Sequence, residues 1–157
     1  MKGLNIPQLR ACVIRPALLH LGLYSLAAEE LLVGTAVQES RLHYLRQLND
    51  GPAMGIFQME PATHNDIWQN YLNYRPELAI KVAALSTEKL RRDAQDMAGN
   101  LFYACAMARV HYMRVPAPLP RADDVEGMAH YWKDHYNTHQ GKGTVAEFVK
   151  HYHEAVA

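Results

Sequence analysis

Glu39 is the residue of this sequence whose surroundings most favour acid chemistry. It ends a helical stretch with an apolar centre at residues 31–37, and helical spacing places it on one face with Leu32, Thr35 and Ala36. Burial and the negative end of the helix dipole both oppose a charge there, which predicts a raised pKa suited to a general acid near neutral pH. The alternative is a frayed helix end that leaves Glu39 in water.

Nine histidines raise a second possibility, a metal site. His135 and His139 are four residues apart, and His151 and His153 lie close together. A zinc peptidase or amidase helix carries His-Glu-x-x-His, whereas Tyr-Asn-Thr separates His135 from His139. We therefore expect neither a metal nor any other cofactor.

The elements that must position Glu39 have mostly helical periodicity. Helices are predicted at residues 7–21, 26–40, 62–74, 76–85, 87–113, 123–136 and 145–155. Pro16 should kink or split the first, and Ser25 and Thr144 suit the N-caps of the helices that follow them. Two short apolar runs flank an Asn-Asp-Gly-Pro turn. The expected fold class is mainly α with at most a small β-hairpin near residues 44–58.

The composition fits one globular domain over residues 1–157, with residues 1–25 as an N-terminal helical segment packed on it. The 16 basic and 16 acidic residues balance, which gives no electrostatic reason to expect nucleic-acid binding. Cys12 and Cys105 lie in apolar stretches and are predicted to be buried free thiols. No run reaches the roughly 18–20 apolar residues of a membrane span, and no export signal is evident, so we expect a cytoplasmic protein without stable membrane insertion.

Two segments together resemble the active-site core of soluble lytic transglycosylases and goose-type lysozymes. They are Gln38-Glu39-Ser40 and, after a short gap, Gly55-Ile56-Phe57-Gln58-Met59-Glu60-Pro61-Ala62-Thr63. Residues 96–112 resemble the family's helix behind the site, and Tyr136-Asn137 resembles its Tyr-Asn element facing substrate. The form as a whole looks most like small single-domain phage endolysins, over about residues 28–148.

The resemblance implies a lysozyme-like fold and an enzyme that cleaves the β-1,4 bond between N-acetylmuramic acid and N-acetylglucosamine in peptidoglycan, with Glu39 as the acid. The residues it implies in substrate binding are Ser40, Ile56, Phe57, Gln58, Tyr136 and Asn137. The family's Tyr-Asn-Ala-Gly becomes Tyr-Asn-Thr-His here, which makes Tyr131 a competitor for the tyrosine's role.

The second step of such a reaction has two forms. In a transglycosylase the sugar's own hydroxyl attacks, and one glutamate suffices. In an inverting hydrolase a second carboxylate activates water at roughly 6.5–9.5 Å from the acid. Asp50 and Glu60 are the candidates for that carboxylate, although Asp50 also suits a turn and Glu60 the start of a helix at Pro61.

The expected partner is the glycan strand, and the expected state is a monomer. An endolysin of this kind would stay in the host cytoplasm until a holin-type membrane-permeabilising protein releases it to the periplasmic cell wall, where it lyses the host. Two alternatives stay open: a non-enzymatic wall-binding or virion structural module on the same fold, and a chitinase-type glycosidase.

Overall fold

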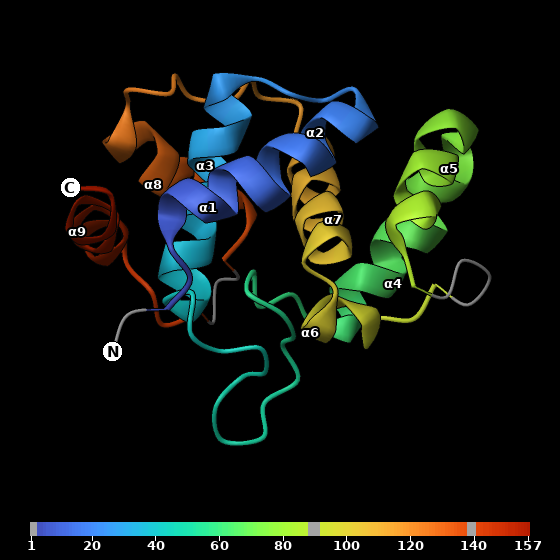
Figure 1. Ribbon diagram of the computed structural model, residues 1–157, viewed down its shortest axis with the longest axis horizontal. Helices are drawn as coiled ribbons and strands as arrows, with labels where there is room; N and C mark the ends of the chain where they lie inside the picture. The colour runs from blue at the N-terminus through green and yellow to red at the C-terminus, as the bar shows by residue number, and fades with distance from the viewer. Residues whose placement is uncertain (1–2, 88–91, 138–140) are drawn as a thin grey trace.

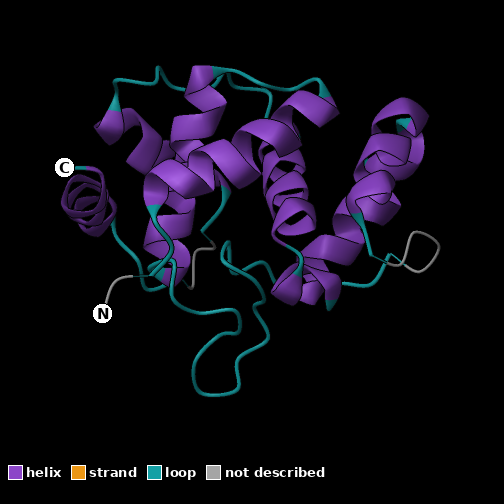
Figure 2. Cartoon of the chain, viewed as in Figure 1, coloured by secondary structure: helices purple, strands orange, loops and turns teal. Residues whose placement is uncertain are grey.

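The computed structural model of the chain describes residues 3–87, 92–137 and 141–157. Its helical elements are α1 (Ile6–Leu9), the π-helical turn η1 (Arg10–Ile14), α2 (Arg15–Leu21), α3 (Leu26–Ser40), α4 (Pro61–Asn70), the 3-10 helix η2 (Leu72–Tyr74), α5 (Pro76–Leu85), α6 (Asp96–Gly99), α7 (Leu101–Met113), α8 (Val125–His135) and α9 (Val145–Val156). These described residues form no β-strand (Figure 2), so the predicted mainly α fold is confirmed. No helix among them has the length and apolar character to cross a membrane.

The helices α3 and α7 form the centre of the molecule and contact each other (Figure 1). Both are buried over most of their surface, since apolar residues lie nearly all round each helix. A buried hydrogen bond of 2.8 Å between the hydroxyls of Thr35 and Tyr112 joins them. Helices α8 and α9 pack on α3, whereas α2, α4 and α5 contact α7. Gly34 allows α9 to approach α3, because a Cβ there would lie 2.5 Å from the ring of Phe148.

The N-terminal helical run changes its winding before Pro16. Arg15 donates its backbone N–H to the carbonyl of Arg10, five residues back, which widens the helix into the π-turn η1. Proline has no N–H, and its ring crowds the carbonyl four residues before it, so the wider turn relieves this conflict. The predicted irregularity at Pro16 therefore takes the form of a π-turn, and the buried side chains of this run, such as Ile14 and Leu18, face the core.

A cluster of charged side chains around Glu29 connects this N-terminal run to α3. The fully buried Glu29 carboxylate accepts hydrogen bonds from Arg10 at 2.9 Å and from Arg15 at 2.6 Å. Tyr24 is the third residue that donates to it, at 3.1 Å. Burial raises the pKa of Glu29, but the hydrogen bonds from Arg15 and Arg10 outweigh it and hold the pKa below its ordinary value.

A long loop, residues 41–60, connects α3 to α4. Isolated antiparallel bridges pair Arg46 with Met54 and Met54 with Met59, so this region is an extended loop in place of a regular hairpin. Asn49 and Asp50 turn the chain with positive φ angles of 60° and 59°. Gly55 has a φ of 76°, and a Cβ there would lie 2.3 Å from a carbonyl oxygen of α6, so only glycine lets the loop lie against that helix.

The prediction of one helix over residues 87–113 is wrong. The short α6 ends at Gly99, and Asn100 then adopts an extended backbone with φ −109° and ψ 97°. Its side chain accepts the N–H of Tyr103 at 3.0 Å and so caps α7. Asparagine favours such caps because its side chain competes for nearby backbone groups. Residues 88–91 of the predicted helix lie outside the described residues.

The two cysteines differ in their surroundings. Cys105 is a buried free thiol on α7, as predicted. Cys12 is also free, but it is exposed, so the prediction of burial is wrong for this residue. Val13 and Ile14 of η1 are buried, whereas Ala11 and Cys12 lie on its exposed side.

Candidate active site

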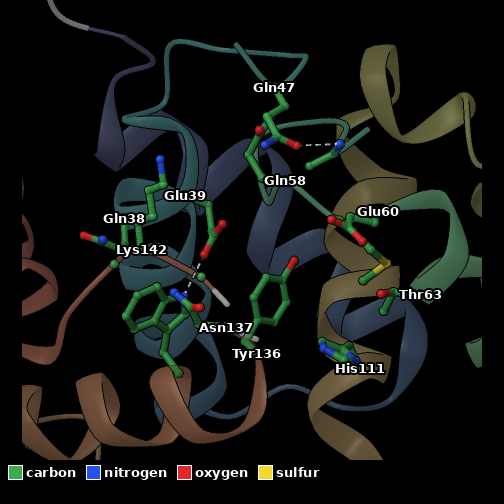
Figure 3. Close-up of a pocket in the computed structure, with 15 residues that line it drawn as sticks. Gln38, Glu39, Gln47, Gln58, Glu60, Thr63, His111, Tyr136, Asn137 and Lys142 are labelled. Carbon is green, nitrogen blue, oxygen red and sulfur yellow. Dashed lines mark hydrogen bonds between the residues drawn. The ribbon is translucent and has the colours of Figure 1, made fainter. Parts of the chain in front are cut away.

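A cleft of about 550 Å³ opens at the C-terminal end of α3, between the loop of residues 41–60 and the segment that follows α8. Its walls come from four parts of the chain far apart in sequence (Figure 3). They are lined by Gln38, Glu39, Gln47, Ala53, Gln58, Met59, Glu60, Thr63, His111, Trp132, Tyr136, Asn137, Gly141, Lys142 and Gly143. Five of the predicted site residues therefore share one cavity: Glu39, Gln58, Glu60, Tyr136 and Asn137.

Glu39 points into this cleft from the last turn of α3 and is half-buried. Its Oε2 accepts a hydrogen bond of 2.9 Å from Nε1 of Trp132. Burial raises the pKa of Glu39 to about 7, although the Trp132 hydrogen bond and the charge of Lys133 act to lower it. The rise has the direction expected from the sequence. The frayed-end alternative does not describe this residue, because α3 continues to Ser40.

Ser40 holds the end of α3 and lies outside the cleft lining. Its hydroxyl is buried, donates to the carbonyl of Ala36 at 3.1 Å and accepts the N–H of Leu42 at 3.2 Å. Arg41 then leaves the helix with a φ of 55°. The substrate contact predicted for Ser40 is therefore not supported by its position. Its hydroxyl fixes the turn that follows Glu39.

The segment after Gly55 divides between core and cleft. The side chains of Ile56 and Phe57 are each only 1% exposed and belong to the core, and neither residue is in the cleft lining. Gln58 does line the cleft, with a φ of 49° and its amide donating to the carbonyl of Gly55 at 2.9 Å. Phe57 contributes its carbonyl, which accepts the Tyr136 hydroxyl at 2.7 Å.

Tyr136 and Tyr131 have separate positions. Tyr136 lines the cleft, and its hydroxyl is held by Phe57. Tyr131 is buried, donates its hydroxyl to the carbonyl of Ala117 at 3.0 Å and packs on the ring of Tyr112. Of the two tyrosines, Tyr136 alone is in the cleft lining. Thr138 and His139, which stand where the family has Ala and Gly, lie outside the described residues.

Asn137 carries a polar atom that lacks a partner. Its Oδ1 is buried and accepts no hydrogen bond from the described residues. Gly141 packs directly against it, since a Cβ at Gly141 would lie 1.6 Å from Oδ1. Lys133 holds this wall in place by donating to the carbonyls of Gly141 and Gly143 at 3.2 and 2.6 Å. A buried oxygen without a donor costs stability, so this wall of the cleft carries a polar atom that the described residues do not compensate.

The two candidates for a second carboxylate are separated by the fold. Glu60 lies directly before α4 and lines the cleft on the wall opposite Glu39, together with Thr63 and His111 (Figure 3). Asp50 sits in the exposed turn of the long loop and is not in the lining. Of the two, only Glu60 faces the cavity that holds Glu39.

The sequence did not lead us to predict Trp132 or His111 as residues of the site. A signal for Trp132 existed, since its spacing of four from Tyr136 places both on one side of a helix end. No comparable signal marks His111, whose pKa falls to about 4, chiefly by burial and also by the charge of Arg114. Arg114 donates to Nδ1 of His111 at 3.0 Å, so the neutral ring carries its proton on Nε2.

A second cavity of about 360 Å³ adjoins the cleft. It shares Thr63, His111, Tyr136 and Asn137 with the cleft, and its remaining walls include the ion pair between Asp66 and Arg114. The two cavities are therefore neighbours. Among the described parts of the chain, no group of three or more His, Cys, Asp or Glu side chains is placed to hold a metal ion.

Comparisons with known proteins identify no relative. No protein-family description matches the chain, and neither a curated protein nor a solved structure is significantly similar to it.

Proposed function

We propose that this protein is a glycosidase of peptidoglycan with a lysozyme-like fold, and that Glu39 is its general acid. The observation that carries the proposal is the state of Glu39: a half-buried carboxyl group with a pKa of about 7, facing a cleft of about 550 Å³. An acid with a pKa near the working pH is protonated in a useful fraction of molecules and still transfers its proton readily. The resemblance of Gln38-Glu39-Ser40 and the Gly55–Thr63 segment to transglycosylases and goose-type lysozymes supports the same role.

The neighbours of Glu39 suit proton donation to a glycosidic oxygen. As the bond between the anomeric carbon and the leaving oxygen breaks, the proton of Glu39 passes to that oxygen. The carboxylate left behind keeps the hydrogen bond from Trp132 and lies near the charge of Lys133, and both favour the ionised form. The same carboxylate faces the positive charge that develops on the sugar.

Many other residues of the cleft suit a hydroxyl-rich polymer. Four side-chain amides line it: Gln38, Gln47, Gln58 and Asn137. Amides offer both donors and acceptors, as sugar hydroxyls and acetamido groups require. Tyr136 adds aromatic surface, and the adjoining cavity adds to the space available to a glycan strand.

Two routes complete the reaction. In the first, the C6 hydroxyl of muramic acid attacks the anomeric carbon, its proton returns to Glu39, and a 1,6-anhydro ring forms. In the second, Glu60 takes a proton from water, which attacks in place of the sugar hydroxyl. Both routes use the same first step, so the proposal for Glu39 does not depend on which one operates.

The biological setting follows from the resemblance to phage endolysins. We propose that the enzyme degrades the host cell wall during lysis and reaches it with the help of a holin-type membrane-permeabilising protein. Its partner is the glycan strand, which it binds as a monomer.

Digestion of purified peptidoglycan, followed by mass spectrometry of the released muropeptides, tests the proposal. Cleavage that requires Glu39 is expected, with muramic acid at the new ends. Products with 1,6-anhydro rings identify the transglycosylase route, and reducing ends identify the hydrolase. Cleavage of chitin oligomers without cleavage of peptidoglycan would identify a chitinase instead. Binding to the wall without soluble products would identify a non-enzymatic module.

A further inference from the structure

A chain of side-chain contacts connects the C-terminal helix α9 to the residue next to Glu39. Nδ1 of His151 lies 2.7 Å from Oε1 of Gln38, and Nε2 of the same ring lies 2.6 Å from a guanidinium nitrogen of Arg41. Gln38 lines the cleft, whereas His151 and Arg41 are not in its lining. The contacts therefore run from outside the cleft to a side chain in its wall.

The chemistry of the three groups determines the direction of both hydrogen bonds. A guanidinium group only donates, so Nε2 of His151 must accept and is unprotonated. The ring proton is then on Nδ1, which donates to Oε1 of Gln38. Burial and the charge of Arg41 lower the pKa of His151, which keeps the ring neutral near pH 7.

This direction leaves the nitrogen of the Gln38 amide without an acceptor among the described residues, while Gln38 belongs to the cleft lining. Oε1 is occupied by His151, and among the described residues no group accepts a hydrogen bond from Nε2. The nitrogen lies beside Gly143, since a Cβ at Gly143 would be 2.9 Å from it. Turning the amide over would bring its N–H groups against the N–H of His151, so the observed orientation is the favourable one.

We propose that Gln38 binds the ligand of the cleft by donating its side-chain N–H to an acceptor oxygen, and that His151 is the positioning residue that fixes this orientation. An acetamido carbonyl of an N-acetylated sugar is such an acceptor. The choice of this ligand rests on the proposed function, whereas the orientation of Gln38 does not.

The ring tautomer of His151 tests the orientation without any ligand. Long-range ¹H–¹⁵N correlation spectra of the intact protein distinguish a protonated ring nitrogen from an unprotonated one. We expect the proton of His151 on Nδ1 at neutral pH. A proton on Nε2 would contradict the proposed orientation of Gln38, because its side-chain oxygen would then have no donor from His151.

Binding of an N-acetylglucosamine tetramer to the full chain carrying Glu39→Gln tests the ligand role by calorimetry. Adding Gln38→Met or His151→Leu should weaken binding roughly threefold to tenfold, the range of one hydrogen bond. His151→Asn should restore most of the loss, because the Asn amide nitrogen can take the place of Nδ1. His153→Leu, an exposed change on the same helix, is the matched control and should leave binding unchanged.

Two results would contradict the proposal. Unchanged affinity in Gln38→Met would show that its amide does not contact the ligand. Equal losses in His151→Leu and His151→Asn would show that His151 acts through packing alone. If the Glu39→Gln protein binds no glycan at all, glycan recognition by the cleft and by Gln38 fails together, while the tautomer still decides the orientation.

Discussion

The indole Nε1 of Trp132 donates a hydrogen bond of 2.9 Å to Oε2 of Glu39, and so joins α8 to the last turn of α3. This contact stabilises the ionised carboxylate, whereas burial destabilises it more strongly and raises its pKa to about 7. Two opposing effects therefore determine the pKa of Glu39. Changing either effect should shift the pH profile of activity in a direction that can be stated in advance.

Replacing Trp132 with Phe should move the alkaline limit of activity to higher pH. The substitution removes the N–H that favours the carboxylate but retains an aromatic ring, so the pKa of Glu39 should rise further. The measurement is the pH profile of kcat/KM for peptidoglycan cleavage. Wild type should lose activity above about pH 7. An unchanged alkaline limit in the variant would mean that Trp132 does not tune the acid.

Replacing Glu39 with Gln should reduce cleavage by roughly 10²–10⁴-fold, the usual contribution of a general acid. Gln keeps an oxygen to accept the Trp132 hydrogen bond, so the fold should be retained. Glu77→Gln, an exposed change on α5, is the control and should keep wild-type activity. Substantial cleavage by the Glu39 variant would exclude this residue as the acid.

The same variant should change how stability depends on pH. The folded pKa of Glu39, about 7, lies above the ordinary value of 4.5, so the folded state holds a proton between these values that the unfolded state has released. Stability contributed by this group is present below pH 4.5 and is lost as pH rises through 7. Between pH 4 and pH 8, the free energy of unfolding measured with urea should therefore fall by up to about 3 kcal/mol more in wild type than in Glu39→Gln. Parallel pH curves for the two proteins would contradict the raised pKa.

The roles of Glu60 and Asp50 can be separated by pairing rates with products. Asp50→Asn should cleave within about twofold of wild type, because its side chain lies outside the cleft lining and exposed substitutions have small effects. If wild type forms reducing ends, Glu60→Gln should lose rate by orders of magnitude, on the order of 10²-fold or more. If it forms 1,6-anhydro ends, Glu60→Gln should remain active. A large loss in Asp50→Asn would refute this assignment.

Replacing Gly141 with Ala should disturb the wall that carries Asn137. The new Cβ would lie 1.6 Å from Oδ1 of Asn137, so the loop or the amide must move. We expect weaker binding of an N-acetylglucosamine tetramer and a loss of roughly 1–3 kcal/mol in the free energy of unfolding. Gly99→Ala is the matched control, because a Cβ there meets no atom within 4 Å. Equal effects of the two changes would argue against a tight fit at Gly141.

Much of the local structure was determined by the sequence alone. The predicted helices over residues 26–40 and 76–85 have the observed bounds of α3 and α5. Capping explains the first of these, since Ser25 accepts the N–H of Ala28 at 3.0 Å. The apolar face and the helix end together also predicted the raised pKa of Glu39. The bounds of these helices depend on residues within one or two helical turns, where periodicity and capping rules apply.

Other features were decided only by tertiary structure. Trp132 is 93 residues from Glu39, and no local pattern predicts that contact. Glu60 and Asp50 are both candidates in the sequence, but the path of the loop brings only Glu60 to the cleft. Ser40, Ile56 and Phe57 are buried because α3 and the loop turn them inward. The physical reason is common to all of these: which side of an element faces a cavity depends on what packs against its other sides, and that is set by contacts between distant parts of the chain.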